Sequence, residues 1–351
     1  MRKPTLKVWQ KPMWLVLAAA MMVGAGRAGA TGLSFNKFVV FGDSLTDVGN
    51  LSHADDGLLP GPLSNYTTGM FTDGATTTPS TTIVGNYAYQ LNNALGFTTL
   101  LPSATGGTDY AYGGAVTGQS LTYSGITVPG IDTQVNSYVD SGPANPADNL
   151  YLLWGGGNDI LNAAEATGAT ASSIDQAATS AATNMVDNIK ALYQSGARDF
   201  IWLNLPNLAL TPEGSGLPTA AYLAPAVDDF NSSFNQYVAQ LMSTSYPGLK
   251  LDAVDVNTLF NKIITNPTSY GLSNVTAEAQ GQRGVNPDKY LFWDGIHPTT
   301  AADQLLVEQT APGIMATFGG SPAPEPSSWL LLLVGVGFWR LMPRGIPSRR
   351  R

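Results

Sequence analysis

The sequence contains no cysteine and only two histidines, His53 and His297, in 351 residues. The missing cysteine excludes disulfides, thiolate metal sites and cysteine nucleophiles. Two histidines are too few for a zinc site built from several imidazoles. No Gly-Lys-Ser/Thr follows the glycine run at residues 155–157, so a phosphate-binding loop of that type is also excluded. We therefore expect neither a metal nor a cofactor.

Charged residues are also scarce, at 12% against about 25% in average soluble proteins. Ten of the 17 basic residues lie before residue 31 or after residue 339, and only Glu325 of the 25 acidic residues lies outside residues 31–320. That central stretch therefore carries 7 − 24 = −17 charges. An acidic surface repels phosphate backbones, so nucleic-acid binding is not expected.

The N-terminus is typical of a secretory signal peptide. A basic start (residues 1–11) precedes an apolar run (residues 13–23), and Ala28-Gly29-Ala30 has the small-x-small form of a cleavage site. The apolar run is shorter than the roughly 20 residues that span a membrane. We expect residues 1–30 to be removed, with an uncleaved anchor as the alternative.

The C-terminus has three parts: a proline-rich spacer (Ser321–Ser328), an apolar segment (Trp329–Trp339) and an arginine-containing tail. Residues 321–351 resemble the bacterial PEP-CTERM sorting signal, with Pro324-Glu325-Pro326 as its motif. The resemblance implies export, contact with sorting machinery, transient membrane association and processing near the motif. A plain C-terminal membrane anchor is the alternative. Both ends indicate a protein at the cell surface, in the extracellular matrix or secreted.

The body, residues 31–320, shows no repeat and no clear linker. Short apolar runs predict four strands, at Lys37–Gly42, Asn149–Trp154, Asp199–Leu205 and Lys250–Val256. Helical periodicity predicts helices at Asn86–Leu95, Ile174–Tyr193, Tyr222–Met242 and Thr300–Phe318. Strands that alternate with helices indicate one α/β domain with a mainly parallel sheet.

Ser44 follows the first predicted strand, within Gly42-Asp43-Ser44-Leu45. A strand fixes such a serine while the turn exposes its hydroxyl, which suits a nucleophile. The alternative is a turn serine that caps the next helix. No Gly-x-Ser-x-Gly occurs, so the nucleophile elbow of α/β-hydrolases is absent.

Asp294 and His297 lie three residues apart, across Gly295. A carboxylate so placed can orient the imidazole and stabilise its cation, leaving the other ring nitrogen free to take a serine proton. The alternative is a structural hydrogen bond before the helix that starts near residue 300. His53 lies in an acidic loop and is predicted to be a solvated surface residue.

Two further clusters carry groups that can hold an oxyanion. Asn158 follows the glycines after the second strand and has an amide to donate. The pair Gly113-Gly114 offers backbone N–H groups, although glycine pairs are common in turns.

Together the four clusters resemble the SGNH, or GDSL-type, hydrolases, in the order Ser, Gly, Asn, Asp and His. Phe71-Thr72-Asp73-Gly74 and Tyr290–Trp293 also resemble family segments. The resemblance implies a flavodoxin-like three-layer α/β/α fold and ester hydrolysis without a cofactor. Asp109 stands where relatives often have asparagine, so this block departs from the pattern.

The roles that the resemblance implies are specific. Ser44 is the nucleophile, His297 the general base and then acid, and Asp294 its orienter. The oxyanion is held by the Ser44 and Gly113 N–H groups and the Asn158 amide, with Gly114 as the alternative to Gly113. Asp43 and Asp159 are expected to fix loops.

Three functions are compatible with these residues. The first is an exported esterase or lipase that acts on acyl or lipid esters. The second is an O-deacetylase that acts on acetylated exopolysaccharide, suggested by the C-terminal signal. The third is a non-catalytic surface or matrix protein on a hydrolase scaffold, which would have no need of the complete set of catalytic side chains.

Overall fold

The computed structural model describes residues 33–61, 65–67, 69–74 and 83–319. The predicted signal peptide (residues 1–30) and C-terminal sorting signal (residues 321–351) lie outside these residues and stay predictions. Within the described ranges, no helix has the length and apolar character needed to cross a membrane.

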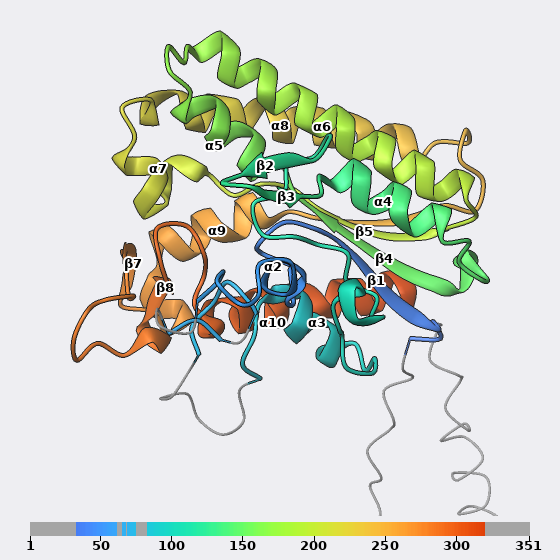
Figure 1. The fold of residues 1–351 in the computed structure, drawn as a ribbon, viewed down its shortest axis with the longest axis horizontal. Coiled ribbons are helices and arrows are strands. Elements are labelled where there is room, and N and C mark those ends of the chain that lie inside the picture. Colours follow the sequence, from blue (N-terminus) through green and yellow to red (C-terminus); the bar gives the residue numbers. More distant parts are fainter. Residues whose placement is uncertain (1–32, 62–64, 68, 75–82, 320–351) are drawn as a thin grey trace, which may run out of the picture. The chain divides into compact units, whose positions relative to one another are not determined.

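Four parallel strands form the central sheet in the order β1-β4-β5-β6 (Figure 1). They are β1 (Lys37–Gly42), β4 (Asn149–Trp154), β5 (Asp199–Leu203) and β6 (Lys250–Val254). All four predicted strands are confirmed, although β5 and β6 end two residues before the predicted boundary. The strand β6 ends early because the Asp255 carboxylate accepts a hydrogen bond from the Thr258 N–H and caps a helix that starts at Val256.

Residues 108–112 run along the other edge of β1. The Val40 N–H donates to the carbonyl of Thr108 at 3.0 Å, and the N–H groups of Tyr110 and Tyr112 donate to the carbonyls of Val40 and Gly42 at 2.8 and 3.2 Å. The bridge between Val40 and Asp109 is parallel. Counted as the second strand, this stretch gives the order 2-1-3-4-5, which is the flavodoxin-like order.

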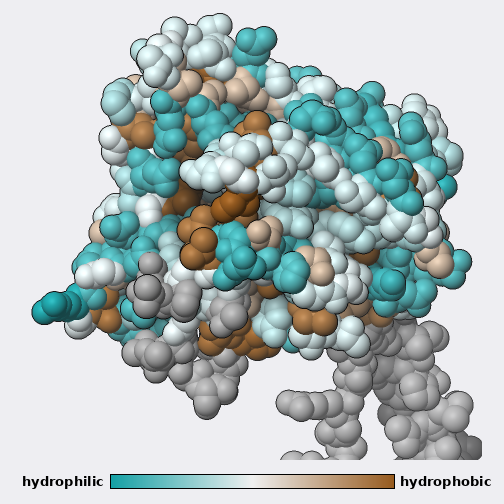
Figure 2. Space-filling model, viewed as in Figure 1, coloured by the Kyte–Doolittle hydropathy of each residue, from teal (hydrophilic) through white to brown (hydrophobic). Residues whose placement is uncertain are grey.

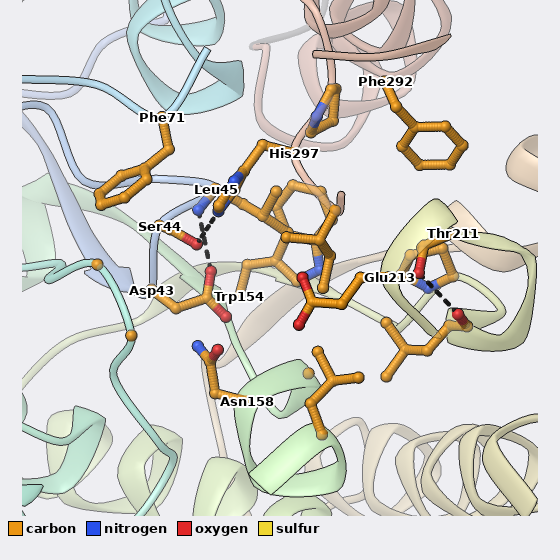
Figure 3. Close-up of a pocket in the computed structure, with 18 of the residues that line it drawn as sticks. Asp43, Ser44, Leu45, Phe71, Trp154, Asn158, Thr211, Glu213, Phe292 and His297 are labelled. Atoms are coloured by element: carbon orange, nitrogen blue, oxygen red, sulfur yellow. Dashed lines mark hydrogen bonds between the residues drawn. The ribbon is translucent and has the colours of Figure 1, made fainter. Parts of the chain in front are cut away.

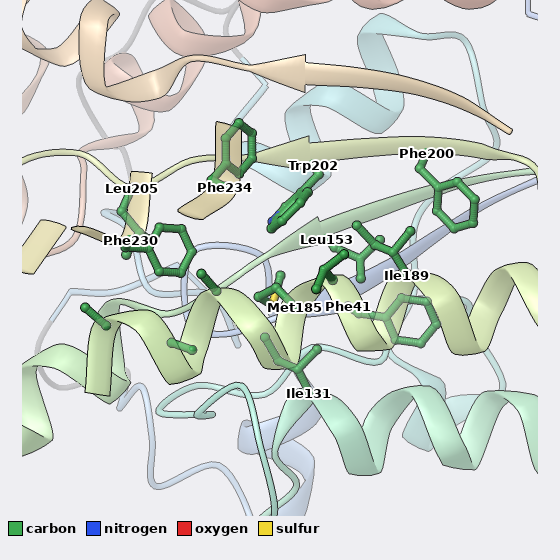
Figure 4. Packing of buried hydrophobic residues seen from close by; sticks show 14 of the residues in the cluster. Phe41, Ile131, Leu153, Met185, Ile189, Phe200, Trp202, Leu205, Phe230 and Phe234 are labelled. Carbon is green, nitrogen blue, oxygen red and sulfur yellow. The ribbon is translucent and has the colours of Figure 1, made fainter. Parts of the chain in front are cut away.

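Helices cover both faces of the sheet, and successive strand residues alternate between two cores. One core holds Phe41, Leu153 and Trp202 against helices (Figure 4). Its helices are α4 (Ile131–Asp140), α5 (Gly157–Glu165), α6 (Ala171–Gln194) and α8 (Ala220–Leu241). The other core holds Val40 and Leu152 against helices α3 (Tyr87–Ala94) and α10 (Thr300–Phe318). The predicted three-layer α/β/α fold is therefore confirmed.

The four predicted helices are α3, α6, α8 and α10, and each observed end lies within three residues of its predicted position. Helix α6 starts three residues early because Thr170 and Ser173 form a capping box at its N-terminus. The sequence did not predict α4, α5 or α9 (Val256–Thr265).

Shorter elements surround the carboxyl ends of the strands. They are α2 (Asn50–Ala54), α7 (Pro212–Gly216), the antiparallel hairpin of β2 (Leu121–Tyr123) and β3 (Ile126–Val128), and the parallel pair β7 (Asn274–Glu278) and β8 (Tyr290–Phe292). In open α/β sheets, ligands bind outside the carboxyl ends of the strands. This end of the sheet is therefore where the chemistry is expected.

Candidate active site

Ser44 lies in the turn directly after β1. A Cβ atom on Gly42 would lie 2.3 Å from Thr46 Oγ1 and 2.5 Å from the carbonyl oxygen of Trp154, so only glycine fits at the start of this turn. Gln134 of α4 accepts a hydrogen bond from the Gly42 N–H at 3.0 Å and donates to its carbonyl at 2.9 Å. The strand end, and with it Ser44, is thereby fixed.

Ser44, His297 and Asp294 form a continuous chain of short contacts, of which Figure 3 shows the Ser44–His297 part. His297 Nε2 lies 2.7 Å from Ser44 Oγ, and His297 Nδ1 lies 2.7 Å from Asp294 Oδ2. The side chains of His297 and Asp294 are only 13% and 12% exposed. In this geometry the imidazole can take the serine proton while the carboxylate stabilises the resulting cation.

Asp294 is held by four hydrogen bonds. Its Oδ1 accepts from the N–H groups of Ile296 and His297 at 2.9 and 2.7 Å, and its Oδ2 accepts from the Tyr66 hydroxyl at 2.5 Å as well as from His297. Burial alone would raise the pKa of Asp294. The interaction with His297 and the hydrogen bonds from His297 and Tyr66 outweigh burial and hold this pKa well below its usual value. Asp294 therefore stays ionised beside the imidazole.

Tyr66 belongs to a group of residues that supports the histidine loop from a distant part of the chain. We call Tyr66, Phe71, Thr72 and Asp73 the brace. Besides the Tyr66 contact, the brace makes three others. The ring centroids of Phe71 and His297 lie 5.0 Å apart. Thr72 Oγ1 donates to the Pro298 carbonyl at 3.0 Å, and Asp73 Oδ1 accepts from the Thr300 N–H at 2.6 Å. The sequence singled out residues 71–74 by their resemblance to a family segment. It held no signal for Tyr66.

The two candidate oxyanion glycines differ in what their N–H groups contact. The Gly113 N–H donates to Asp47 Oδ2 at 2.8 Å. The Gly114 N–H has no partner among the residues that the structure describes. Both glycines line the same cavity as Ser44. Of the pair, Gly114 is the one whose N–H is free for a ligand.

Asn158 lies in the first turn of α5 and lines the same cavity (Figure 3). One hydrogen of its amide group is used, because Nδ2 donates to the Ala115 carbonyl at 2.9 Å. An amide nitrogen carries two hydrogens. The second is free to donate to an oxyanion.

Three buried carboxyl groups nearby hold loops. Asp43 accepts from the Leu45 N–H at 3.0 Å, and burial raises its pKa to about 7. Asp159 accepts from the N–H and the hydroxyl of Thr117, and burial raises its pKa to about 6. Asp109 accepts two backbone N–H groups, and burial together with the charge of Asp47 raises its pKa well above its usual value. The hydrogen bonds of Asp43 and Asp159 agree with the loop-fixing role expected for them.

A cavity of about 480 Å³ opens beside Ser44 and His297. One part of it, which we call the apolar arm, is formed by Val256, Phe260 and Ile263 of α9, Phe292 of β8 and Leu306 of α10. The space-filling view shows hydrophobic surface in a hollow of this face near the β2–β3 hairpin (Figure 2). Trp154 is buried in the sheet and also lines the cavity.

His53 is exposed on α2 and does not line this cavity, in agreement with its predicted surface position. In the described part of the chain, no group of three or more histidine, aspartate or glutamate side chains could hold a metal ion. The site described above consists of a hydroxyl, an imidazole, a carboxylate and amide donors.

The family model described as GDSL-like Lipase/Acylhydrolase matches residues 38–310. An uncharacterized protein in the trpE-trpG intergenic region of Pseudomonas putida is 29% identical over 325 residues, which cover 85% of this chain and 51% of that protein. The chain thus spans about half the length of this relative. A GDSL esterase/lipase of Arabidopsis thaliana is 25% identical over 338 residues, covering 82% of this chain and 91% of that protein.

Among solved structures, a carbohydrate acetylesterase family member from Sinorhizobium meliloti is 12% identical, with a TM-score of 0.43, covering 81% of this chain and 99% of that one. A likeness at this level carries no argument about substrate. The family match, by contrast, spans most of the chain, from β1 to α10, and contains the Ser44, Asn158, Asp294 and His297 positions. The chain belongs to the GDSL-like lipase/acylhydrolase family of ester hydrolases.

Proposed function

We propose that this protein is an exported serine hydrolase that cleaves carboxylic esters of apolar acyl chains. Ser44 is the nucleophile, His297 the general base and acid, and Asp294 the residue that orients His297. The observation that carries the proposal is the pair of 2.7 Å contacts that link Ser44 Oγ through the imidazole to Asp294.

The reaction follows from this geometry. Ser44 Oγ attacks the acyl carbon while His297 Nε2 takes its proton, and the carbonyl oxygen becomes an oxyanion. His297 then gives the proton to the alkoxide oxygen as the bond to the alcohol breaks, which leaves an acyl-enzyme. Water attacks the acyl-enzyme with His297 again as base, and the acid and free Ser44 are released.

We assign the oxyanion hole to the N–H groups of Ser44 and Gly114 and to the Asn158 amide. The sequence preferred Gly113, but the Gly113 N–H already donates to Asp47, which supports Gly114 in its place. Removing one such donor typically costs about 10²–10³ in kcat.

The apolar arm favours long acyl chains over acetyl groups. Each buried CH₂ group contributes about 0.8 kcal/mol, and an acetyl group has none to place among Val256, Phe260 and Ile263. This supports an esterase or lipase over the alternative of an exopolysaccharide O-deacetylase.

The test compares the full-length wild type with Ser44→Ala on nitrophenyl acetate and nitrophenyl decanoate. We expect the wild type to prefer decanoate in kcat/KM. We expect Ser44→Ala, shown to be folded by circular dichroism, to lose at least about 10³-fold on both. A preference for acetate would contradict the acyl-chain assignment, and turnover retained by Ser44→Ala would contradict the mechanism.

A matched pair on α9 tests the apolar arm. Ile263→Phe narrows the arm, so we expect the decanoate-to-acetate ratio to fall about tenfold. Ile264→Phe adds the same volume at the neighbouring residue, which does not line the cavity, and should leave the ratio unchanged. Equal effects of the two substitutions would place the acyl chain elsewhere.

The export part of the proposal rests on residues 1–30 and 321–351. Protein recovered from outside the cytoplasm of the cells that produce it is expected to begin at Thr31 by N-terminal sequencing. Its intact mass is expected to show whether the segment after Pro326 has been removed. An exported protein that still begins at Met1 would support an uncleaved anchor instead.

A further inference from the structure

Glu213 on α7 places an unpartnered carboxylate in the catalytic cavity. Its backbone N–H donates to the Gly295 carbonyl at 2.7 Å, between the two catalytic positions Asp294 and His297. Its Oε2 lies 3.3 Å from the point that a Cβ atom on Gly295 would occupy. Among the described residues, none donates a hydrogen bond to the Glu213 carboxylate, which Figure 3 shows pointing into the cavity.

Glu213 is the exposed carboxylate among the described residues that line the cavity. The described residues that line the cavity include no lysine or arginine. Asp43 and Asp303 also line it, but both are buried. Glu213, by contrast, is exposed, so its carboxylate is accessible to a ligand. A cationic group of a substrate could therefore approach Glu213 without meeting a lysine or arginine side chain of the cavity wall.

We infer that Glu213 determines specificity for the alcohol part of the ester, by attracting a cationic group such as a quaternary ammonium. The inference rests on the proposed function, since it assumes that the acyl chain occupies the apolar arm and leaves the alcohol near Glu213. Near a protein surface a carboxylate attracts a cation more strongly than in bulk water. The same charge disfavours anionic esters.

A pair of esters that differ only in charge tests this inference. Butyrylcholine and 3,3-dimethylbutyl butyrate have the same acyl group and nearly the same shape, but only the first is cationic. We expect wild-type kcat/KM, measured by pH-stat titration, to favour butyrylcholine about tenfold. Glu213→Gln keeps the size and the backbone contact to Gly295 while removing the charge, so the ratio of the two kcat/KM values is expected to fall about tenfold.

Glu308→Gln is the matched control, because Glu308 is an exposed acid on α10 that does not line the cavity. It should leave the ratio unchanged. An unchanged ratio in Glu213→Gln, or equal slowing on both esters, would overturn the inference and assign Glu213 a role in supporting Gly295. If Glu213→Gln hydrolyses neither ester, an inhibition experiment on the wild type tests the inference instead. Tetramethylammonium should inhibit hydrolysis of the neutral ester more strongly than neopentyl alcohol does. Equal inhibition by the two compounds would reject the inference.

The two proposals fail in different ways. A wild type that hydrolyses neither butyrate ester nor nitrophenyl decanoate contradicts the proposed function. A wild type that hydrolyses the neutral ester, loses this activity in Ser44→Ala and shows no preference for the cation contradicts only the role of Glu213.

Discussion

The serine turn and the histidine loop meet at one point of the site, but different kinds of contact hold them there. Ser44 follows β1, which pairs with β4 on one edge and with residues 108–112 on the other. The histidine loop, residues 293–299, is closed by a hydrogen bond from the Trp293 N–H to the His297 carbonyl at 2.7 Å. It depends further on the brace, whose Tyr66 lies 228 positions from Asp294 in the sequence.

The difference predicts that the two halves of the site respond differently to substitution. A side chain added at Gly42, where the serine turn starts, has to disturb the sheet, because its Cβ would meet the backbone of β4. Loss of the Tyr66 hydroxyl from the brace is expected to disturb the alignment of Asp294 and His297 without reaching the sheet. A substitution at Gly42 should therefore lower both stability and activity. A substitution at Tyr66 should lower activity with little loss of stability.

The largest effect is expected when the contact between the two halves is removed. His297→Ala removes the proposed general base, so kcat/KM on nitrophenyl decanoate should fall by about 10⁴-fold or more. His53→Ala removes the other histidine from an exposed position and should retain full activity. Loss of activity in His53→Ala instead would mean that the triad has been wrongly assigned.

The serine turn is tested by Gly42→Ala. The new Cβ would meet Thr46 Oγ1 at 2.3 Å and the Trp154 carbonyl at 2.5 Å, so we expect unfolding by urea to show a loss of about 1–3 kcal/mol together with loss of activity. Gly313→Ala is the control, because no atom beyond the adjoining stretch of α10 lies within 4 Å of its Cβ position and alanine favours helix. A Gly42→Ala protein of normal stability would show that the turn is not tightly packed.

The brace is tested by Tyr66→Phe, which keeps the ring and removes the hydroxyl that donates to Asp294. We expect kcat to fall roughly tenfold while the free energy of unfolding changes by less than about 1.5 kcal/mol. Tyr222→Phe, at an exposed tyrosine outside the site, should change neither quantity. Loss of stability with unchanged kcat would make Tyr66 a purely structural residue.

The smallest effect concerns pH. Burial raises the pKa of Asp43 to about 7, so between pH 4 and pH 7 the folded protein holds a proton that the unfolded chain has released. Asp159, with a pKa of about 6, acts in the same direction. Stability should therefore fall as pH rises through this range, by about 1–2 kcal/mol. The stabilising contribution of Asp294, whose pKa is lowered, is lost only below this range and does not oppose the trend.

Urea unfolding at pH 5 and pH 8 measures this effect, and the free energy of unfolding should be higher at pH 5. Asp43→Asn should reduce the difference between the two values. A protein that is equally stable at both pH values would mean that Asp43 loses its proton at its ordinary pKa.

Much of the fold could be predicted because buried parallel strands are continuous apolar runs. The sequences Lys37–Gly42 and Asn149–Trp154 show this pattern, and glycine follows or ends each of them. Helix α9 was missed because Val256 continues the apolar run of β6. Only the side chain of Asp255, which bonds to the Thr258 N–H, shows that the strand has ended. Helix α4 begins with β-branched and polar residues and gives a weak helical signal.

The sequence by itself identified Ser44, Asn158, Asp294 and His297 as candidate catalytic residues, because they lie in short segments whose residue types are suited to this chemistry. It also determined that no cysteine or multi-histidine chemistry could take part. Only the tertiary structure decided which glycine N–H is free, since Asp47 accepts the Gly113 N–H from 66 residues away. The same holds for Tyr66 and Glu213, because their positions relative to the histidine loop depend on packing between distant segments, which no local pattern of residues encodes.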